Sequence, residues 1–222
     1  MKRAVLIVLL VLIIDQILKV YIKTNMYLGQ EYVIANWFII HFTENNGMAF
    51  GLQWGGETGK LLLSLFRLVA VVVLGYYLVR FIKDKKPTLL ITCTSLVLAG
   101  ALGNIIDSML YGYLFTSSEF QIAAFDPGNG YSSLLHGKVV DMFYFPIIQT
   151  ILPEWLPFWG GQSFVFFQPV FNIADASISC GIITGLIFQK RFFPPNEENV
   201  KTGNELITDQ QDQSNDSGNI EA

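Results

Sequence analysis

Residues 4–22 of the chain read AVLIVLLVLIIDQILKVYI, an apolar run of the length that crosses a bilayer, yet it contains Asp15. Two further apolar runs carry an aspartate in the same way: Asp107 in LLITCTSLVLAGALGNIIDSML (89–110) and Asp175 in FVFFQPVFNIADASISCGIITGLIF (164–188). A carboxylate in hydrocarbon costs at least ~2.5–3.5 kcal/mol on insertion scales. Three of them on separate segments predict ionisable chemistry inside a membrane.

The chain has 222 residues, of which 52% are hydrophobic and 14% are charged. Four apolar stretches each approach the ~20 residues that a helix needs to span hydrocarbon. We therefore expect transmembrane helices at about residues 4–22, 61–82, 88–111 and 164–188, with external segments at 23–60 and 112–163. Together these form a membrane-embedded domain of residues 1–193.

The basic residues indicate the orientation of the helices. Nine of them precede the first span, join the second to the third, or follow the fourth, whereas only Lys23, Lys60 and Lys138 lie in the external segments. Because basic residues favour the cytoplasmic side, we expect both termini in the cytoplasm and the aspartates toward the outer leaflet. Residues 194–222 hold seven acids and one lysine, which predicts a disordered acidic cytoplasmic tail. Residues 4–14 also resemble a secretory signal peptide, but the absence of a small-residue cleavage site before Lys19 favours a retained span.

The external segments have their own patterns. Residues 32–54, YVIANWFIIHFTENNGMAFGLQW, predict two or three short strands broken by a tight turn at Asn45-Asn46-Gly47. Residues 151–161, ILPEWLPFWGG, are typical of an interfacial segment approaching the fourth span. The expected fold is an all-α polytopic membrane protein of four transmembrane helices with a small extracytoplasmic β-sheet on the outer membrane surface.

Polar residues within the spans come in pairs at helical spacing. Asp15 and Lys19 are four residues apart, and Asn104 precedes Asp107, as Asn172 precedes Asp175, by three, so each pair shares a helix face. Amides can simply join helices by hydrogen bonds, and for the asparagines that alternative stays open. The aspartates favour function, and Asp141 in VVDMFYF (139–145) adds a fourth acid just outside the spans.

Two carboxylates a few ångströms apart share one proton, so one can act as general base on a water while the other acts as general acid. This is aspartyl-protease chemistry, which needs no cofactor. His41 and His136 stand alone, so we expect no metal site, and Cys93 and Cys180 fall within predicted spans as inert thiols. The composition gives no sign of nucleic-acid binding.

The ordered motifs resemble those of a known family. They are Asp15-Gln16-Ile17-Leu18-Lys19, Asn45-Asn46-Gly47-Met48-Ala49-Phe50, Gly103-Asn104-Ile105-Ile106-Asp107, Val139-Val140-Asp141 and Phe171-Asn172-Ile173-Ala174-Asp175. In this order they are similar to the blocks of the bacterial lipoprotein signal peptidases (signal peptidase II). The resemblance implies an inner-membrane aspartyl endopeptidase that cuts a prolipoprotein just before its diacylglyceryl-modified cysteine.

The resemblance also implies roles for particular residues. Asp141 and Asp175 match the catalytic aspartates, and the supporting positions match Asp15, Lys19, Asn45, Gly47, Asn104, Asp107 and Asn172. The implied partners are lipid-modified prolipoproteins and membrane lipids, and we expect a monomer without a cofactor. One position departs from the family: Ser108 stands where an arginine usually follows the third-helix aspartate, and Lys138 is a candidate substitute. Residues 112–138 look like an insertion.

Two other functions remain open from the residues alone. Intramembrane Asp, Asn and Lys residues also mark the ion pathways of small secondary transporters or proton-coupled channels. Against a transporter, the polar residues gather in the predicted outer half of the spans, and the sequence has no inverted repeat. A scaffold without activity would leave the buried acids without a purpose.

Overall fold

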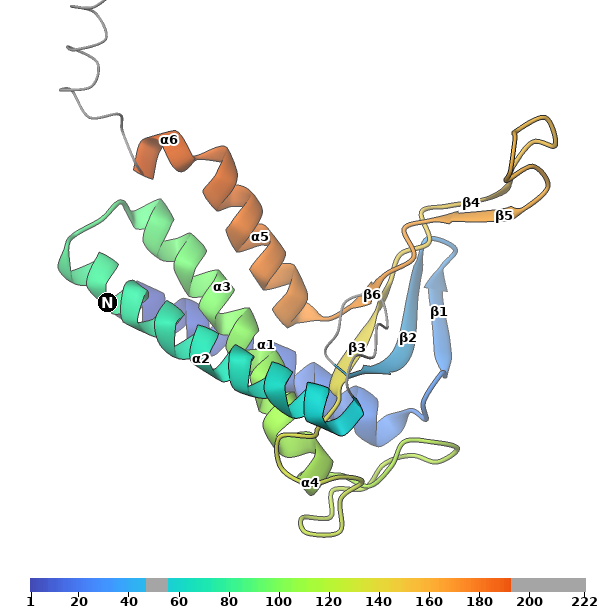
Figure 1. The fold of residues 1–222 in the computed structure, drawn as a ribbon, viewed down its shortest axis with the longest axis horizontal. Helices are drawn as coiled ribbons and strands as arrows, with labels where there is room; N and C mark the ends of the chain where they lie inside the picture. The colour runs from blue at the N-terminus through green and yellow to red at the C-terminus, as the bar shows by residue number, and fades with distance from the viewer. Residues whose placement is uncertain (47–55, 193–222) are drawn as a thin grey trace, which may run out of the picture.

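Three long apolar helices form the body of the protein in the computed structural model, which describes residues 1–46 and 56–192. They are α1 (Lys2–Asn25), α2 (Gly56–Lys83) and α3 (Thr88–Ile106), and they lie side by side in Figure 1. A π-helix (Asp107–Tyr111) and the short α4 (Gly112–Leu114) continue α3 in the same direction. Each of the three is long and apolar enough to cross a membrane, and they occupy the positions of the first three predicted spans.

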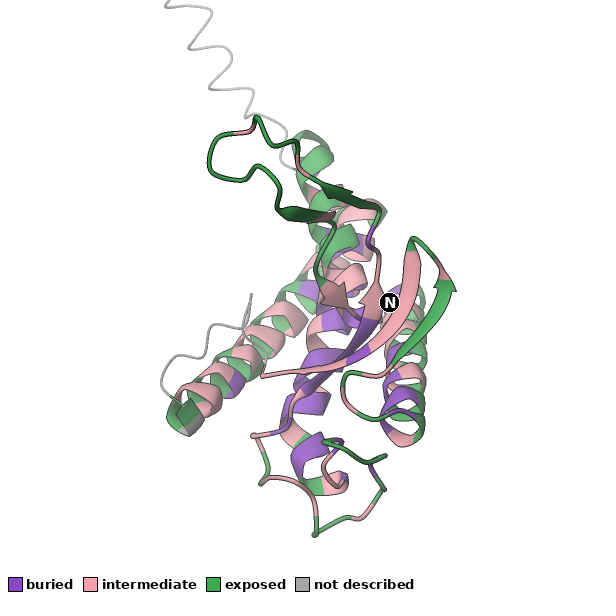
Figure 2. Ribbon diagram, turned by 90° about the vertical axis from the view of Figure 1, so that its right-hand side faces the viewer, coloured by how far each residue is buried: buried purple, intermediate pink, exposed green. Residues whose placement is uncertain are grey.

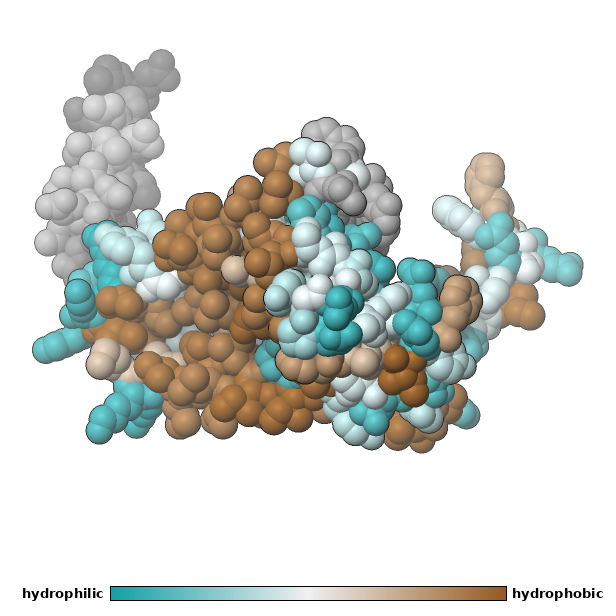
Figure 3. Space-filling model, turned by 90° about the horizontal axis from the view of Figure 1, so that it is seen from below, coloured by the Kyte–Doolittle hydropathy of each residue, from teal (hydrophilic) through white to brown (hydrophobic). Residues whose placement is uncertain are grey.

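The helices present an apolar surface to their surroundings. Seen from below in Figure 3, a broad hydrophobic band covers them, and hydrophilic residues lie beyond the band at both ends. Large side chains on the outer faces of α1 and α2, such as Ile17, Phe66 and Val72, are more than half exposed. A water-soluble protein would bury such residues, whereas lipid covers them at no cost.

The predicted fourth span is wrong over its first nine residues, 164–172. The apolar helix there is α5 (Ile173–Ile187), whereas residues from 163 to 171 form β5 (Ser163–Phe166) and β6 (Val170–Phe171). Phe and Val suit strands as well as helices, and hydropathy alone does not separate the two. Asp175 therefore lies in the first turn of α5 rather than eleven residues into a span. The 15 residues of α5, about 22 Å at 1.5 Å per residue, are followed by the short α6 (Gln189–Phe192).

A four-stranded antiparallel sheet lies at one end of the helices, in the order β1 (Glu31–Ala35), β2 (Phe38–Asn45), β3 (Val139–Tyr144) and β6. The prediction of short strands is confirmed up to residue 45, with a tight turn between β1 and β2 at Asn36-Trp37, whereas the predicted turn at Asn45-Asn46-Gly47 runs beyond the described residues. Pairing of β2 with β3 sets Thr43 opposite Asp141. The sheet joins the two segments predicted to be external, which are almost a hundred residues apart, and it brings Asp141 to the helices.

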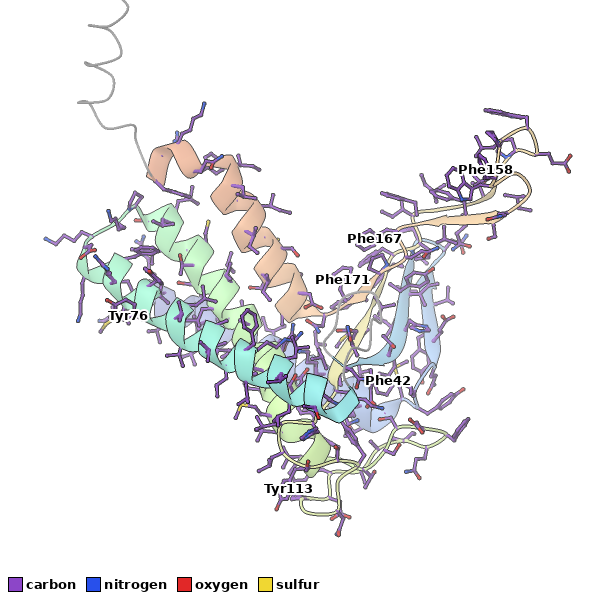
Figure 4. The ribbon with its side chains drawn as sticks, in the orientation of Figure 1. Phe42, Tyr76, Tyr113, Phe158, Phe167 and Phe171 are labelled. Carbon is purple, nitrogen blue, oxygen red and sulfur yellow. The ribbon has the colours of Figure 1, made fainter. Side chains whose placement is uncertain are left out.

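Two external features extend beyond this sheet. Strands β4 (Ile148–Ile151) and β5 form a separate hairpin that projects away from the helices in Figure 1, and Figure 4 places Phe158 near its tip. The predicted interfacial segment 151–161 is therefore the end of a hairpin. The predicted insertion 112–138 folds beside the end of α1, where Ser118 accepts a hydrogen bond from Lys23 Nζ (3.0 Å) and the ring of Tyr131 stacks over that amine.

Helices α3 and α5 approach each other closely at glycines. A Cβ on Gly100 would lie 2.2 Å from the carbonyl oxygen of Ala174, and one on Gly103 would lie 3.1 Å from Ala174 Cβ. Small residues are what allow membrane helices to pack at this distance. In Figure 2 the buried residues gather where α1, α3 and β3 meet, so the closest packing surrounds the polar residues described next. The predicted tail 194–222 lies outside the described residues.

Candidate active site

A buried lysine holds two helices together at the centre of the polar cluster. The Nζ of Lys19 lies 2.9 Å from Asp15 Oδ2 on its own helix and 2.8 Å from Asp107 Oδ2 on the π-helix. All three side chains are at most 1% exposed. Such a group is stable only when each charge is paired and hydrogen-bonded, because burial of a lone charge is very costly. The predicted pair Asp15–Lys19 therefore forms a three-residue ionic cluster with Asp107.

Residues around this cluster satisfy its remaining oxygens. Gln16 Nε2 donates to Asp107 Oδ1 (2.9 Å), and the hydroxyl of Tyr111 donates to Gln16 Oε1 (3.1 Å). Asp15 Oδ1 accepts a hydrogen bond from the backbone N–H of Ala174 (2.9 Å), at the start of α5. Sequence reasoning did not select Gln16 or Tyr111, although Gln16 lies within the first motif. No spacing rule links Gln16 to Asp107 or to Tyr111, since both contacts cross from α1 to the π-helix.

Asp175 is held in the first turn of α5 by a reciprocal cap. The Oδ1 of Asn172 accepts a hydrogen bond from the backbone N–H of Asp175 (2.9 Å), and Asp175 Oδ2 accepts one from the backbone N–H of Asn172 (3.3 Å). Asn104 Nδ2 donates to the other carboxyl oxygen, Asp175 Oδ1 (2.7 Å). The positive end of the helix also stabilises negative charge at this position. Asp175 remains partly exposed, so it can meet a substrate.

Asp141 reaches the same place from the sheet. Asn172 Nδ2 donates to Asp141 Oδ1 (2.7 Å), so one amide touches both aspartates, with its oxygen toward Asp175 and its nitrogen toward Asp141. The backbone N–H of Val140 donates to Asp107 Oδ2 (3.3 Å), which ties β3 to the π-helix. Burial, followed by the neighbouring carboxylate of Asp175, raises the pKa of Asp141 to about 7. At neutral pH this side chain can hold a proton.

Asn104 connects the ionic cluster to the two aspartates. Its Oδ1 accepts hydrogen bonds from Lys19 Nζ (2.9 Å) and Asn172 Nδ2 (3.2 Å), which leaves its nitrogen facing Asp175. The two asparagines are therefore oriented by their own partners, and through these contacts they also join α1, α3 and the start of α5. Hydrogen bonds therefore connect Lys19, through the amides of Asn104 and Asn172, to the carboxyl groups of Asp175 and Asp141.

Of the other predicted residues, Asn45 is paired with Val139 in the sheet, at the end of β2 and beside the strand that carries Asp141. Gly47 lies outside the described residues. Lys138, the candidate substitute for the family's arginine, instead contacts Glu44 (3.5 Å) and Glu119 (3.8 Å). Across residues 1–46 and 56–192, no group of three or more His, Cys, Asp or Glu side chains is arranged to hold a metal ion.

Asp175 in the first turn of α5 and Asp141 on β3 thus share one amide beside a set of apolar helices, an arrangement that suits a membrane hydrolase of the aspartic type. Comparison with known proteins agrees, since residues 7–191 match the family model described as Signal peptidase (SPase) II. The chain belongs to this family. It is an aspartic peptidase of the class that processes prolipoproteins.

Individual relatives support the assignment. The lipoprotein signal peptidase of Porphyromonas gingivalis is 53% identical over 186 residues, which cover 83% of this chain and 81% of that protein. That of Amoebophilus asiaticus is 36% identical over 189 residues, covering 83% and 76%. A solved structure described as a bacterial membrane enzyme has a TM-score of 0.57 at 28% identity and covers 89% of this chain and 93% of that one.

Proposed function

We propose that the protein is an intramembrane aspartyl endopeptidase that cuts diacylglyceryl-modified prolipoproteins on the N-terminal side of the lipidated cysteine. The observation that carries the proposal is the Asn172 side chain, which is hydrogen-bonded to Asp141 by its nitrogen and to the backbone of Asp175 by its oxygen. This arrangement supports a pair of carboxyls that face one reacting bond and differ in protonation.

The environments of the two aspartates suggest their roles. Asp141, with its pKa raised to about 7, holds the proton at neutral pH, while Asp175 receives N–H donors from Asn104 and the backbone of Asn172. Asp175 takes a proton from a water molecule as the water oxygen attacks the scissile carbonyl carbon, and Asp141 gives its proton to the carbonyl oxygen. When the C–N bond breaks, the proton on Asp175 passes to the leaving amine, and Asp141 takes back a proton from a hydroxyl of the tetrahedral intermediate as the new carboxyl forms. No cofactor is needed.

The membrane setting supports the choice of substrate. We propose that α5 is the fourth transmembrane helix, that both termini are cytoplasmic, and that the site faces the outer leaflet of the inner membrane. The aspartates then lie where a signal peptide ends and a lipid anchor begins. The lipid on the cysteine would hold the scissile bond near the site and so raise its effective concentration. The enzyme would work as a monomer, with Asp141 and Asp175 supplied by one chain.

A secondary transporter receives less support. The polar network ends at Asp15, and residues 4–14 of α1, which lead to the opposite end of the helix, are all apolar. The groove between α1 and α2 at that end is also lined mainly by apolar side chains, among them Val5, Val8 and Leu78. An ion leaving the site in this direction would meet hydrocarbon.

Mass spectrometry of purified enzyme with a diacylglyceryl-modified prolipoprotein tests the proposal. We expect release of the signal peptide with the new amino terminus at the modified cysteine. The matched control is the same precursor without the lipid, which should be cut at least about tenfold more slowly. Cleavage at another bond, or equal rates for the two precursors, would contradict the proposed substrate.

A further inference from the structure

A single arginine on α2 faces the site from within an apolar helix. Arg67 is the only charged residue between Lys60 and Arg80. Its neighbours Phe66 and Val69 are more than 60% exposed on the outer face of the helix, whereas Arg67 itself is partly buried. A guanidinium within an apolar helix is costly and normally has polar partners.

The partner that identifies its position is Ser108. Arg67 Nη1 lies 3.4 Å from Ser108 Oγ, and Ser108 Oγ in turn donates to the backbone oxygen of Asn104 (3.0 Å). Asn104 is the residue whose amide nitrogen holds Asp175. The guanidinium therefore lies against the turn of α3 that supports the reactive pair.

The negative charges that act on the guanidinium of Arg67 belong to carboxylates of the candidate active site. The carboxylates that attract it are, in decreasing order, those of Asp175, Asp141 and Asp107. Asp107 is already paired with Lys19, so the negative charge that acts most strongly on Arg67 is the one carried by the Asp141–Asp175 pair.

The three lysines near the site form ion pairs with acidic residues other than Asp141 and Asp175. Lys19 lies between Asp15 and Asp107, Lys23 is bonded to Glu44, and Lys138 contacts Glu44 and Glu119. Arg67 differs from these three lysines because the carboxylate that attracts it most belongs to the reactive pair.

We propose that Arg67 is a positioning residue that keeps the Asp141–Asp175 pair singly ionised at neutral pH and holds the charge on Asp175. The inference rests on the proposed function of the pair. An arginine is suited to this task because it stays protonated even when partly buried. A nearby positive charge favours the ionised form of a carboxyl and so lowers the pH at which the pair loses each of its protons.

The departure at Ser108 suggests a direct exchange test. Arg67 Nη1 lies 3.4 Å from Ser108 Oγ. The side chain of an arginine at residue 108 would therefore begin close to the present position of the Arg67 guanidinium. The double variant Arg67→Ser/Ser108→Arg should deliver the same charge from α3 instead of α2. Arg67→Met removes the charge, and Arg67→Lys keeps it without the planar guanidinium.

The experiment measures kcat and KM of the full chain for the lipidated precursor between pH 5 and 9. For Arg67→Met we expect kcat at pH 7 to fall at least about tenfold, KM to change less than about twofold, and both limbs of the pH profile of kcat to move up by about one unit. Arg67→Lys should keep both limbs near their wild-type positions, and the exchange variant should recover them. The control is Arg80→Met, an exposed arginine on the same helix, which should leave the profile unchanged.

Two results would overturn the inference. One is a pH profile of kcat for Arg67→Met whose two limbs stay at the wild-type pH values, whatever the rate of the variant. The other is an exchange variant whose limbs do not return to the wild-type pH values. If Arg67→Met does not fold, the exchange variant decides, because a wild-type profile supports the inference and an inactive enzyme contradicts it. Failure of the proposed function is distinguishable, since turnover by Asp141→Asn or Asp175→Asn would refute it directly. Inactivity of those two variants together with an unshifted Arg67→Met refutes only the role of Arg67.

Discussion

The side-chain nitrogen of Asn172 lies 2.7 Å from Asp141 Oδ1, while the oxygen of the same amide caps α5 by accepting the backbone N–H of Asp175 at 2.9 Å. The cap decides which way the amide faces, because only its oxygen can accept from an N–H group. A local helix-start motif thus orients a strand residue that precedes it by 31 positions.

Substitutions at Asn172 should separate the cap from the contact with Asp141. Asn172→Ser keeps a capping oxygen, so unfolding in detergent should stay within about 0.5 kcal/mol of wild type, yet it removes the donor to Asp141 and should lower kcat at least about 100-fold. Asn172→Ala should lose both properties, with about 1 kcal/mol of stability. Equal activity of the serine variant and wild type would show that the amide does not position Asp141.

Lys19 should be a requirement for stability as well as activity. Lys19→Met leaves the buried carboxylates of Asp15 and Asp107 facing each other without a cation, which should cost about 3–5 kcal/mol. Adding Asp107→Asn to Lys19→Met should return part of this loss, because one of the two unpaired charges disappears. The control Lys83→Met, at the exposed end of α2, should have little effect. Thermal unfolding of the four proteins in one detergent makes the comparison.

Asp141 should make the stability of the protein depend on pH. Its pKa is raised from the ordinary 3.8 to about 7, so folding favours the neutral carboxyl. That stabilisation is complete below pH 4 and is lost as the pH rises through about 7, a change on the order of 2–4 kcal/mol. Asp141→Asn cannot ionise, so its melting temperature should exceed that of wild type by a margin that grows from pH 5 to pH 8. A constant difference over this range would show that Asp141 is not the titrating group.

The tip of the β4–β5 hairpin should contact lipid headgroups. Phe158 and Trp155 are 91% and 78% exposed there, and aromatic rings favour the membrane interface. In nanodiscs, the fluorescence of Trp155 with the other three tryptophans changed to Phe should be quenched by a spin label near the headgroup. Phe158→Ser should weaken the quenching, and a label at the acyl-chain end should quench less. Emission typical of water without any quenching would place the tip away from the membrane.

Sequence reasoning succeeded where the pattern is local. The length of residues 4–22 predicts a helix, and the four-residue spacing of Asp15 and Lys19 places both side chains on one face of it. The structure has this helix and this pair. It failed at residues 164–171, because a short apolar run suits a strand or a helix and only the pairing of β3 with β6 and of β4 with β5 decides. The signal available was the proline at position 169, which rarely lies inside a helix.

The contacts that cross between elements were beyond the sequence. In the sequence, Arg67 is one arginine within an apolar span, and Ser108, which it contacts, is 41 residues away. Pairing of β2 with β3 is also non-local, so the sequence placed Asp141 near the site only through its resemblance to a family. Side-chain geometry was needed to show that Asn172 joins Asp141 to the cap of Asp175 and that Gln16 belongs to the network.

The paired-carboxyl mechanism is tested most directly by single-turnover cleavage of a diacylglyceryl-modified prolipoprotein by Asp141→Asn and Asp175→Asn. An amide has nearly the same shape as the carboxyl but cannot exchange the proton, so each variant should remain folded and lose at least about 1,000-fold in rate. The control is Asp126→Asn, an aspartate in the external segment 112–138, which should cleave like wild type. More than a few per cent of wild-type turnover by either active-site variant would contradict the assignment of Asp141 and Asp175 as the reacting pair.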